Sequence, residues 1–281
     1  MPRSDGGVAM TTIAQWRKRE AALPPLRWHD TIVTGIREVT SRMVRVTLAA
    51  ESIRSFESTG PDEHFKLILP RTSDPLPDFD LDGNVYAQWR TLPDAVRPIL
   101  RTYTVRSLRR DGGELDVDFA LHAGGTPAMR WLGALRVSDP CAIYGTRSEF
   151  DPPPGTRHVL LLADDAGTPA LARILASLPD TMRADAVIQT RDAGDVQLLE
   201  HGPLAQVTWT HPINDTVGGL GEVARALRHL EQPTEPWYAW AAGAAEALPP
   251  LRAALRRLPG HHRDRLELIG YWRAGGPIDA D

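Results

Sequence analysis

The stretch GTRSEFDPPPGTR, residues 145–157, divides the chain into two parts of different texture. Three consecutive prolines at 152–154 cannot continue a helix or a central strand, so they mark a linker. Before the linker, apolar and polar residues alternate over short runs, and after it nearly continuous apolar runs alternate with amphipathic segments. The chain has 281 residues, which is enough for two compact domains. We therefore predict two domains that meet between residues 150 and 156.

The part before the linker predicts an all-β domain over residues 28–150. Its short alternating runs are separated mostly by Gly, Pro, Asp or Ser: TIVTGIREV, MVRVTLA, HFKLILP, LRTYTVRS, ELDVDFALH and PCAIYG. Several short strands at such spacing indicate an antiparallel barrel or sandwich, and we expect an antiparallel β-barrel. In the N-terminal segment, 1–27, the run TTIAQWRKREAA has helical composition and predicts a short helix on the outside of the barrel.

The part after the linker predicts a doubly wound α/β domain over residues 156–281. Here strand-like and helix-like runs follow one another: RHVLLLA, PALARILASL, ADAVIQT, QVTWTH, VGGLGEVARALRHL, PWYAWAAG, ALPPLRAALRRL and LELIGYW. Nearly continuous apolar strands separated by amphipathic helices are typical of a parallel sheet that is buried on both faces.

Composition and charge exclude several classes of protein. The formal net charge of −4 argues against bulk nucleic-acid binding, which needs a surplus of basic side chains on one face. Cys141 is the single cysteine, so the chain forms no internal disulfide and fits a reducing compartment. No apolar run reaches the ~18 residues that span a bilayer, and we expect a cytoplasmic protein without membrane insertion.

Two features resemble known binding motifs but do not predict a site. The run GLGEVA, 219–224, fits the G-x-G-x-x-A pattern of dinucleotide sites, but it lies late in the domain instead of directly after its first strand. We interpret it as a helix N-terminus. The nine histidines include an adjacent pair, 261–262, but neither an H-E-x-x-H motif nor a cysteine cluster accompanies them, so no metal site is predicted.

The hexapeptide RTYTVR, 101–106, places an aromatic ring and two hydroxyls between two arginines. Successive residues of a strand point to opposite faces, so the odd-numbered residues share one side and the even-numbered residues share the other. A ligand along the strand edge could stack on Tyr103, bond to Thr104 and pair with Arg101. The alternative is a barrel strand decorated with exposed arginines.

Two further segments predict contacts with a ligand. In LHAGGTPAMRW, 121–131, Gly124 and Gly125 allow close approach of the backbone, and the helix start that follows suits a pyrophosphate; a plain turn is the alternative. GYWRAG, 270–275, ends the last predicted parallel strand, beyond which ligands bind in such sheets. An aromatic side chain there could cover a cofactor held by the first domain, or it could belong to the core.

These segments together resemble a known family. A β domain followed by an α/β domain is the layout of the ferredoxin-reductase group. The runs PDEHFKLILP, RPILRTYTVR, DVDFALH with GGTPAMRW, and GYWRAG are similar to those of the siderophore-interacting proteins, which are FAD-dependent ferric-siderophore reductases. The resemblance runs from about Trp28 to Gly275.

The resemblance implies an FAD site between the two domains. Tyr103 would cover a face of the isoalloxazine, Thr104 would bond its reactive edge, and two arginines would hold the phosphates. The segment at 122–131 would bind the FAD diphosphate, with Trp131 near the adenine or in the core, and Tyr271 or Trp272 would lie close to the flavin. The implied cofactor residues are Arg101, Tyr103, Thr104, Val105, Arg106, His122, Gly125, Thr126, Ala128, Trp131, Tyr271 and Trp272.

The resemblance also implies a substrate site. These reductases bind a large anionic ferric complex in a cleft with a few basic residues, and Lys66, Arg130 and Arg273 are the candidates here. His64 is a candidate for contact with the flavin. A solvated strand lysine is the plainer interpretation of Lys66.

The nicotinamide side departs from the family pattern. Where the family carries GDETALPA this chain has ADDAGTPA, one residue shorter when counted from Asp165 to Pro169, and where the family has AGEA the chain has AGAA, with Ala244 in place of a glutamate. GPRG at the barrel end reads GTRS. The candidate residues for the α/β domain, which by resemblance is NAD(P)H-binding-like, are Asp165, Gly167, Thr168, Pro169 and Gly243.

Three functions follow as hypotheses. The first is an FAD-dependent ferric-siderophore reductase that takes electrons from NADH, NADPH or a ferredoxin-type protein donor. The second, favoured by the altered nicotinamide motifs, is a flavoenzyme of the same fold with another, biosynthetic reaction. The third is a non-catalytic binding protein for ferric siderophores.

Overall fold

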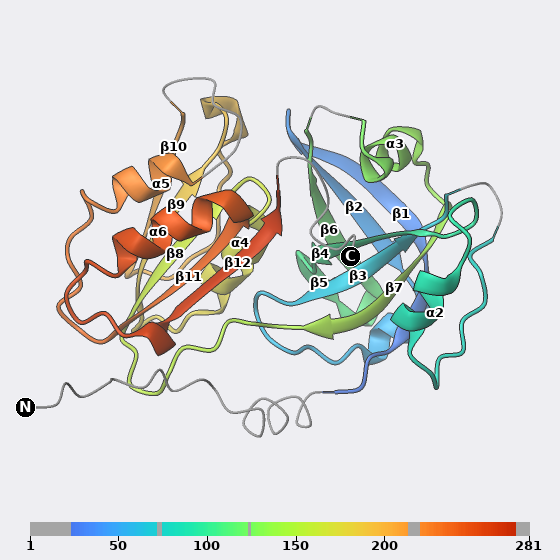
Figure 1. Ribbon diagram of the computed structural model, residues 1–281, viewed down its shortest axis with the longest axis horizontal. Coiled ribbons are helices and arrows are strands. Elements are labelled where there is room, and N and C mark those ends of the chain that lie inside the picture. Colours follow the sequence, from blue (N-terminus) through green and yellow to red (C-terminus); the bar gives the residue numbers. More distant parts are fainter. Residues whose placement is uncertain (1–23, 72–74, 123–124, 213–219, 274–281) are drawn as a thin grey trace, which may run out of the picture.

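The computed structural model describes residues 24–71, 75–122, 125–212 and 220–273. Two domains lie side by side, joined by the segment between β7 and β8 (Figure 1). The helix predicted at 11–22 lies outside the described residues. Among those that are described, no helix is long and apolar enough to cross a membrane.

The first domain is a sheet of seven antiparallel strands in the order β4-β3-β7-β1-β2-β6-β5. The strands are β1 (Trp28–Thr40), β2 (Met43–Ala49), β3 (His64–Leu69), β4 (Ile99–Thr104), β5 (Ser107–Arg109), β6 (Glu114–Ala120) and β7 (Pro140–Arg147). The shorter elements are η1 (Glu51–Ser55), α2 (Val85–Thr91), η2 (Arg110–Gly112) and α3 (Pro127–Ala134).

The two end strands of this sheet, β4 and β5, belong to one continuous stretch of chain, separated only by Val105 and Arg106. The backbone N–H of Arg106 donates to the carbonyl of Asp116 in β6 at 2.7 Å, so the stretch 99–109 pairs with β3 on one side and with β6 on the other. The sheet therefore closes on itself, and the predicted antiparallel barrel is confirmed.

Alternation along the strands fills the barrel with apolar side chains. The interior core includes Val46, Leu48, Phe65, Leu67, Val117, Phe119 and Ile143. Outside the barrel, α2 covers a second, smaller cluster in which Tyr86 and Trp89 pack against Ile68 and Leu100.

The second domain is a five-stranded parallel sheet in the order β10-β9-β8-β11-β12. Its strands are β8 (His158–Asp164), β9 (Arg183–Gln189), β10 (Ala205–Thr210), β11 (Trp237–Ala244) and β12 (Leu266–Trp272). Its helices and turns are α4 (Thr168–Ser177), η3 (Ala193–Asp195), α5 (Gly221–Ala226), η4 (Ala245–Ala247), α6 (Leu248–Leu255) and η5 (Arg263–Arg265).

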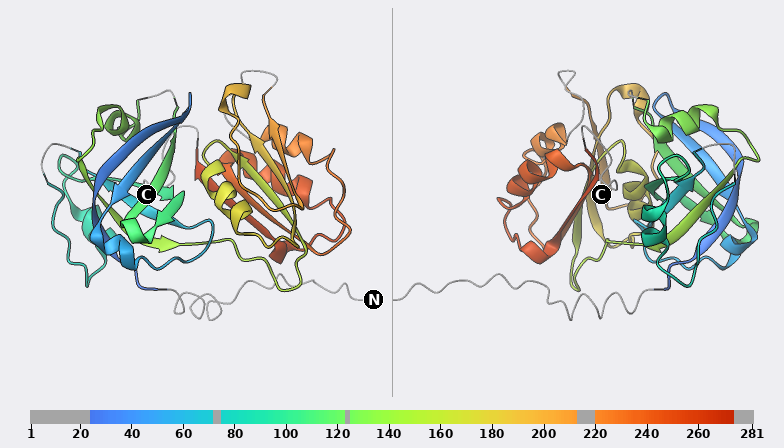
Figure 2. Two further views of the ribbon diagram at one scale, coloured as in Figure 1. Left: turned by 180° about the vertical axis from the view of Figure 1, so that it is seen from behind. Right: turned by 45° about the vertical axis from the view of Figure 1, so that its right-hand side comes forward.

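Helices cover both faces of this parallel sheet, which confirms the doubly wound prediction. On one face α4 packs in a core with β8, β9 and β11, and on the other face α5 and α6 form a separate core (Figure 2). The α5 helix begins at Gly221, in agreement with a helix N-terminus in the GLGEVA run. The strand order reverses between β8 and β11, so a ligand crevice is expected at their carboxyl ends.

Buried acidic side chains of the barrel fix it to the second domain. Asp62 is fully buried, and its carboxylate accepts hydrogen bonds from the Ser148 hydroxyl and from the N–H groups of Glu149 (3.1 Å) and Phe150 (3.0 Å) in the linker. It also accepts one from the indole of Trp240 in β11, at 3.0 Å. One carboxylate thus joins the barrel, the linker and the α/β sheet.

The neighbouring Glu63 makes a second joint. Its buried carboxylate accepts from the Thr146 hydroxyl at 2.8 Å and lies 3.4 Å from the guanidinium of Arg173 in α4. Arg173 also donates to the backbone carbonyl of Val105 at 2.8 Å. The first helix of the α/β domain therefore reaches directly to the RTYTVR segment.

Candidate functional site

The odd-numbered residues of RTYTVR face the interior of the barrel, as the alternation predicts. Val105 is fully buried in the barrel core, and the ring centroid of Tyr103 lies 4.3 Å from that of Phe119, which in turn lies 6.0 Å from Trp131 of α3. Burial raises the pKa of Tyr103, so the phenol stays neutral. The guanidinium of Arg101 donates to the carbonyl of Leu100 at 2.6 Å.

The even-numbered residues face outward. Thr102 accepts a hydrogen bond from the Lys66 ammonium at 2.7 Å, and Thr104 is buried. His64 stands opposite Thr104 in the β3–β4 register, so their side chains share a face. Burial lowers the pKa of His64, and its imidazole is neutral at pH 7.

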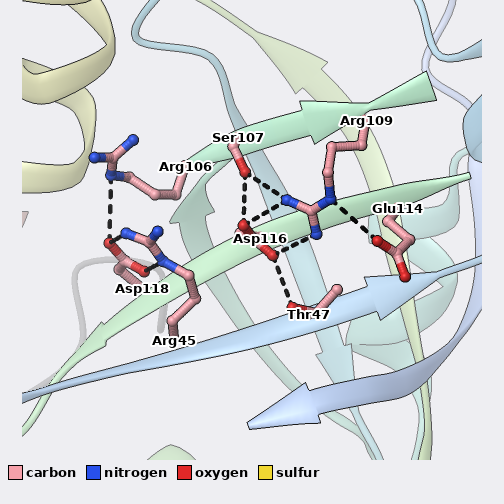
Figure 3. Close-up of polar contacts among 8 residues, drawn as sticks. All are labelled: Arg45, Thr47, Arg106, Ser107, Arg109, Glu114, Asp116 and Asp118. Atoms are coloured by element: carbon pink, nitrogen blue, oxygen red, sulfur yellow. Dashed lines mark hydrogen bonds and ion pairs between the residues drawn. The ribbon is translucent and has the colours of Figure 1, made fainter. Parts of the chain in front are cut away.

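Arg106 turns toward two aspartates of β6, Asp116 and Asp118, which are called the acidic ladder below (Figure 3). Its guanidinium lies 3.5 Å from Asp118, and Arg45 holds the same carboxylate in a two-point contact at 2.6 and 2.8 Å. Burial, followed by the charge of Arg45, lowers the pKa of Arg106. In this conformation the charge of Arg106 is directed to Asp118, and its role toward phosphates stays a prediction.

One step along the ladder, Asp116 accepts from Arg109 (2.7 and 2.8 Å), Ser107 (2.6 Å) and Thr47 (2.8 Å) (Figure 3). Burial opposes ionisation, yet these donors hold the pKa of Asp116 below its ordinary range. The ladder thus holds together strands β2, β5 and β6 beside the RTYTVR segment.

The two residues before α3, Gly125 and Thr126, are called the cradle below because of the role predicted for them. Gly125 is exposed and has φ of +53°, and among the described residues a Cβ placed on it would meet no atom within 4 Å. Thr126 is the N-cap of α3, accepting from the N–H of Met129 at 3.4 Å, and Pro127 follows at the first helical position. Arg130 is exposed and donates to the Gly125 carbonyl. Of the other candidates on this segment, Ala128 is buried in the core and His122 is exposed.

Asp164, the last residue of β8, lies at the carboxyl end of the parallel sheet, where a ligand crevice is expected. Its buried carboxylate accepts four hydrogen bonds: from the N–H groups of Ala166 (3.0 Å), Gly167 (3.2 Å) and Ala244 (2.9 Å), and from the indole of Trp272 (2.8 Å). Burial raises its pKa, and the hydrogen bonds oppose that shift. The groups that would be free for a phosphate at the start of α4 are therefore bound by a side chain of the protein itself.

The predicted nicotinamide residues lie on the elements next to Asp164. Thr168 donates its hydroxyl to the Asp164 carbonyl at 2.9 Å, and Pro169 follows it in the first turn of α4. A Cβ on Gly243 would lie 2.5 Å from Asp164, and one on Gly167 would lie 2.5 Å from the Ala242 carbonyl. Both glycines are thus required by the close approach of β8, β11 and the start of α4.

Asp164 was not among the predicted site residues, because Asp165 was matched to the aspartate of the family pattern in its place. Without a gap, ADDAGTPA and GDETALPA have the same length, and Asp164 stands at the family's aspartate while Asp165 stands at its glutamate. Burial, and then the charges of Asp164 and Asp195, raise the pKa of Asp165 to about 7.

The two aromatic residues that end β12 contact different domains. The Tyr271 hydroxyl is buried and lies beside the Thr104 side chain of the barrel. Burial raises its pKa. Trp272 turns to Asp164 instead. His64, Thr104 and Tyr271 thus lie at the domain border, and their contact with a flavin stays a prediction.

A further contact between the domains lies at the tip of the β1–β2 hairpin. Ser41 donates to the buried carboxylate of Asp195 at 3.2 Å, and Arg42 lies 3.6 Å from it. The carbonyl of Arg42 accepts from the N–H of Leu121, which precedes the cradle, at 2.7 Å.

The three basic candidates for substrate lie on three separate elements: Lys66 on β3, Arg130 on α3 and Arg273 directly after β12. Arg273 is exposed like Arg130, whereas Lys66 is half-buried and bonded to Thr102. A shared substrate cleft for them stays a prediction.

A closed β-barrel followed by a parallel α/β domain is the ferredoxin-reductase-like architecture, and here the tyrosine–threonine strand lies at the border between the two domains. The chain belongs to the siderophore-interacting protein family. Residues 32–150 match the siderophore-interacting FAD-binding domain, and residues 156–275 match the siderophore-interacting protein domain.

Individual relatives agree with this assignment. A siderophore utilization protein from T. fusca is 31% identical, with a TM-score of 0.75 over 90% of this chain and 95% of the other. The ferric vibriobactin reductase ViuB of Vibrio cholerae is 26% identical over 84% of this chain and 86% of its own. The NADPH-dependent ferric-chelate reductase of Escherichia coli is 26% identical over 89% and 94%.

Proposed function

We propose that this protein is an FAD-dependent ferric-siderophore reductase, which passes electrons from NADPH or NADH to Fe(III) in a siderophore complex. The observation that carries the proposal is the meeting of His64 and Thr104 of the barrel with Tyr271 of the α/β domain. The relatives with matching domains include enzymes named as ferric-chelate reductases.

The described residues fit an FAD. The hydroxyls of Tyr271 and Thr104 offer hydrogen bonds at one place, and Tyr103 offers an aromatic side chain on the same strand as Thr104. At the cradle, Gly125 leaves open space where a side chain would otherwise stand, and α3 begins directly after it. Tyr103, Thr104 and Tyr271 would hold the flavin, and Gly125 with Thr126 would hold the diphosphate.

FAD, when bound, would accept two electrons as a hydride and release them singly. Two Fe(III) ions would then become Fe(II), which hard oxygen ligands hold less tightly. The protein contributes position and charge. His64 is neutral and Tyr271 stays protonated, so neither adds charge beside the flavin. Lys66, Arg130 and Arg273 would attract the anionic ferric complex.

The test is reconstitution of the purified protein with FAD, followed by anaerobic mixing with NADPH or NADH and then with a ferric siderophore. We expect flavin absorption, bleaching by a nicotinamide, and recovery of the absorption as an Fe(II) chelator develops colour. A protein that stays colourless after reconstitution would contradict the proposal and leave the binding-protein hypothesis.

A second candidate is a flavoenzyme of the same fold with another electron donor or another reaction. It is favoured by Asp164, which binds the N–H groups at the start of α4 that a dinucleotide phosphate would use. If the bound flavin is bleached by dithionite or by a reduced ferredoxin but by neither nicotinamide, this candidate replaces the first.

A further inference from the structure

The edge strand β10 of the parallel sheet is unprotected. It pairs with β9 alone among the described strands, in an unbroken register from Ala205 to Thr210. Exposed edge strands usually carry a charged side chain, a proline or a bulge, any of which hinders pairing with another chain. The opposite edge strand, β12, has two of these devices, Glu267 and an irregular step in its pairing with β11. The run AQVTWT of β10 has none of them.

The backbone of β10 leaves two residues available for pairing. The carbonyls of Leu204 and Thr210 accept from backbone N–H groups of the stretch 184–190, at 3.2 and 3.0 Å, so the even-numbered residues direct their peptide groups toward β9. Because this direction alternates along a strand, the N–H and C=O groups of Val207 and Trp209 point away from the sheet. No strand of the described part of the chain lies on that side of β10.

An apolar groove lies beside this edge. It is lined mainly by Val196, Leu198 and Leu199 of the loop before β10, and by Val207 and Trp209 of the strand itself. The side chain of Leu198 is fully exposed and that of Val196 is 44% exposed, whereas Leu199 is buried in the core of the domain. Neither β10 nor the run VQLL at 196–199 carries a charged side chain, so two copies that meet here bring no like charges together.

Antiparallel pairing of β10 with the β10 of a second copy is self-complementary. A two-fold axis at Thr208 places this residue opposite its own copy. Val207 then faces Trp209 of the second copy, and Gln206 faces Thr210. An aromatic residue opposite a β-branched one and a pair of threonines are both stabilising cross-strand pairs. In this register Val207 and Trp209 form the hydrogen-bonded pairs, which use the peptide groups that point outward, and Thr208 forms the closer, non-hydrogen-bonded pair at the axis.

We propose that β10 is a dimerisation strand, which pairs with the β10 of a second copy and joins the two five-stranded sheets into one continuous sheet. The assembly closes at two copies, because a two-fold axis uses the same edge of both chains. It covers the exposed side chains of Val196 and Leu198. The interface lies at the sheet edge opposite β12, which carries Tyr271, so the inference goes beyond the proposed function and does not depend on it.

The first experiment measures the mass of the full chain by sedimentation velocity over a concentration series. We expect twice the 30.9 kDa of the single chain at the upper concentrations. Thr208→Lys should weaken self-association about tenfold, because two ammonium groups face each other at the axis. Thr208 is exposed, so this substitution leaves the pairing with β9 intact. Thr34→Lys is the control, since Thr34 is an exposed threonine on the barrel strand β1.

The second experiment tests the register by cysteine cross-linking. Cys141 is buried, so a cysteine placed on β10 supplies the accessible thiol. Thr208→Cys should form a covalent dimer on oxidation with diamide, because residues opposite each other in such a pair have Cβ atoms ~4.5–5.5 Å apart. Gln206→Cys is the matched control, also exposed on the same face of β10. Its two thiols would be separated by four residues, about 13 Å, and should not cross-link.

A wild type that is monomeric at every concentration overturns the inference and leaves the edge to a strand of a different protein. It is also overturned by a dimer that Thr208→Lys does not weaken, or by cross-linking of Gln206→Cys in preference to Thr208→Cys. Both experiments are performed without FAD and without a siderophore, so failure of the proposed function does not affect them. Thr208→Lys should reduce a ferric siderophore at the same rate as the wild type.

Discussion

At the scale of single residues, the side chains that matter do two things at once. Tyr103 packs against Phe119 of the barrel core and is also the aromatic side chain that we propose for contact with a flavin. Asp164 satisfies four donors and also fixes Trp272. Substitutions at such positions need readouts that separate packing from ligand binding.

Replacing Tyr103 by Ala should weaken FAD binding by at least tenfold, because a stacking face is lost. Flavin retention during gel filtration and titration of the apoprotein with FAD would measure the change. Tyr86→Ala is a matched control, since Tyr86 stacks on Trp89 outside the barrel. Equal FAD affinity of Tyr103→Ala and the wild type would count against the site.

Asp165 predicts a pH dependence of stability. Its pKa is about 7 in the folded state against 3.8 for an unperturbed aspartate, so between these values the folded state binds more protons than the unfolded chain. The contribution of Asp165 to the free energy of unfolding therefore falls as the pH rises from about 4 to 7.

Asp165→Asn removes the loss of stability that comes from ionising a buried carboxyl. We expect the variant to be more stable than the wild type by ~1 to 2 kcal/mol at pH 8, after allowance for solvent screening, and no more stable at pH 4. Urea denaturation at both pH values measures it. Asp180→Asn, at an exposed aspartate of the same domain, should show no such change between the two pH values.

At the scale of elements, two patterns were sufficient to predict the fold class: the alternation of apolar and polar residues in the β domain, and the nearly continuous apolar runs in the α/β domain. The same alternation placed Tyr103 and Thr104 on opposite faces. Helix α2 was not predicted, because its seven residues gain their stability from the packing of Tyr86 and Trp89 against Ile68 and Leu100, which are distant in sequence.

The candidate site was predictable to the extent that its motifs are local. The cradle before α3 follows from Gly125 and Thr126, whose conformations depend on near neighbours. The contacts of Asp164 with Ala244 and Trp272 join three strands, and no spacing along the chain reveals them. Arg106 was assigned to phosphates by resemblance, whereas its pairing with Asp118 depends on the register of β6.

The turn between β8 and α4 depends on a glycine for space. A Cβ on Gly167 would lie 2.5 Å from the backbone oxygen of Ala242 and 3.0 Å from the Cβ of Ala163. Since backbone cannot yield as a flexible side chain does, Gly167→Ala should destabilise the protein by ~1 to 3 kcal/mol, measured by urea denaturation. Gly221→Ala, where a Cβ meets no atom within 4 Å, should cost nothing; equal losses at both sites would refute the argument.

At the scale of the whole molecule, the domain pair is held by buried polar contacts. Asp62 receives donors from the linker and from Trp240, and Glu63 lies against Arg173. Buried carboxylates that lose a donor are costly, so the relative placement of the domains is strongly specified. This placement is what sets Tyr271 beside Thr104.

Trp240→Phe should therefore loosen the joint between the domains. Trp237→Phe is its control, because Trp237 is equally buried in β11 but donates to the Pro259 carbonyl within its own domain, at 2.7 Å. We expect both variants to lose similar stability, on the order of 1 to 3 kcal/mol. Only Trp240→Phe should speed proteolysis in the linker at 148–157; equally fast cleavage of both would show that Asp62 does not couple the domains.

Closure of the barrel through Val105 and Arg106 has a thermodynamic consequence. The segment RTYTVR, which holds five of the residues predicted to contact FAD, also completes the barrel wall, since the stretch 99–109 pairs with β3 and with β6. A ligand that binds this segment therefore also stabilises the barrel wall. Flavin occupancy and resistance of the whole β domain to heat should consequently rise and fall together, so the melting temperature becomes a gauge of cofactor loading.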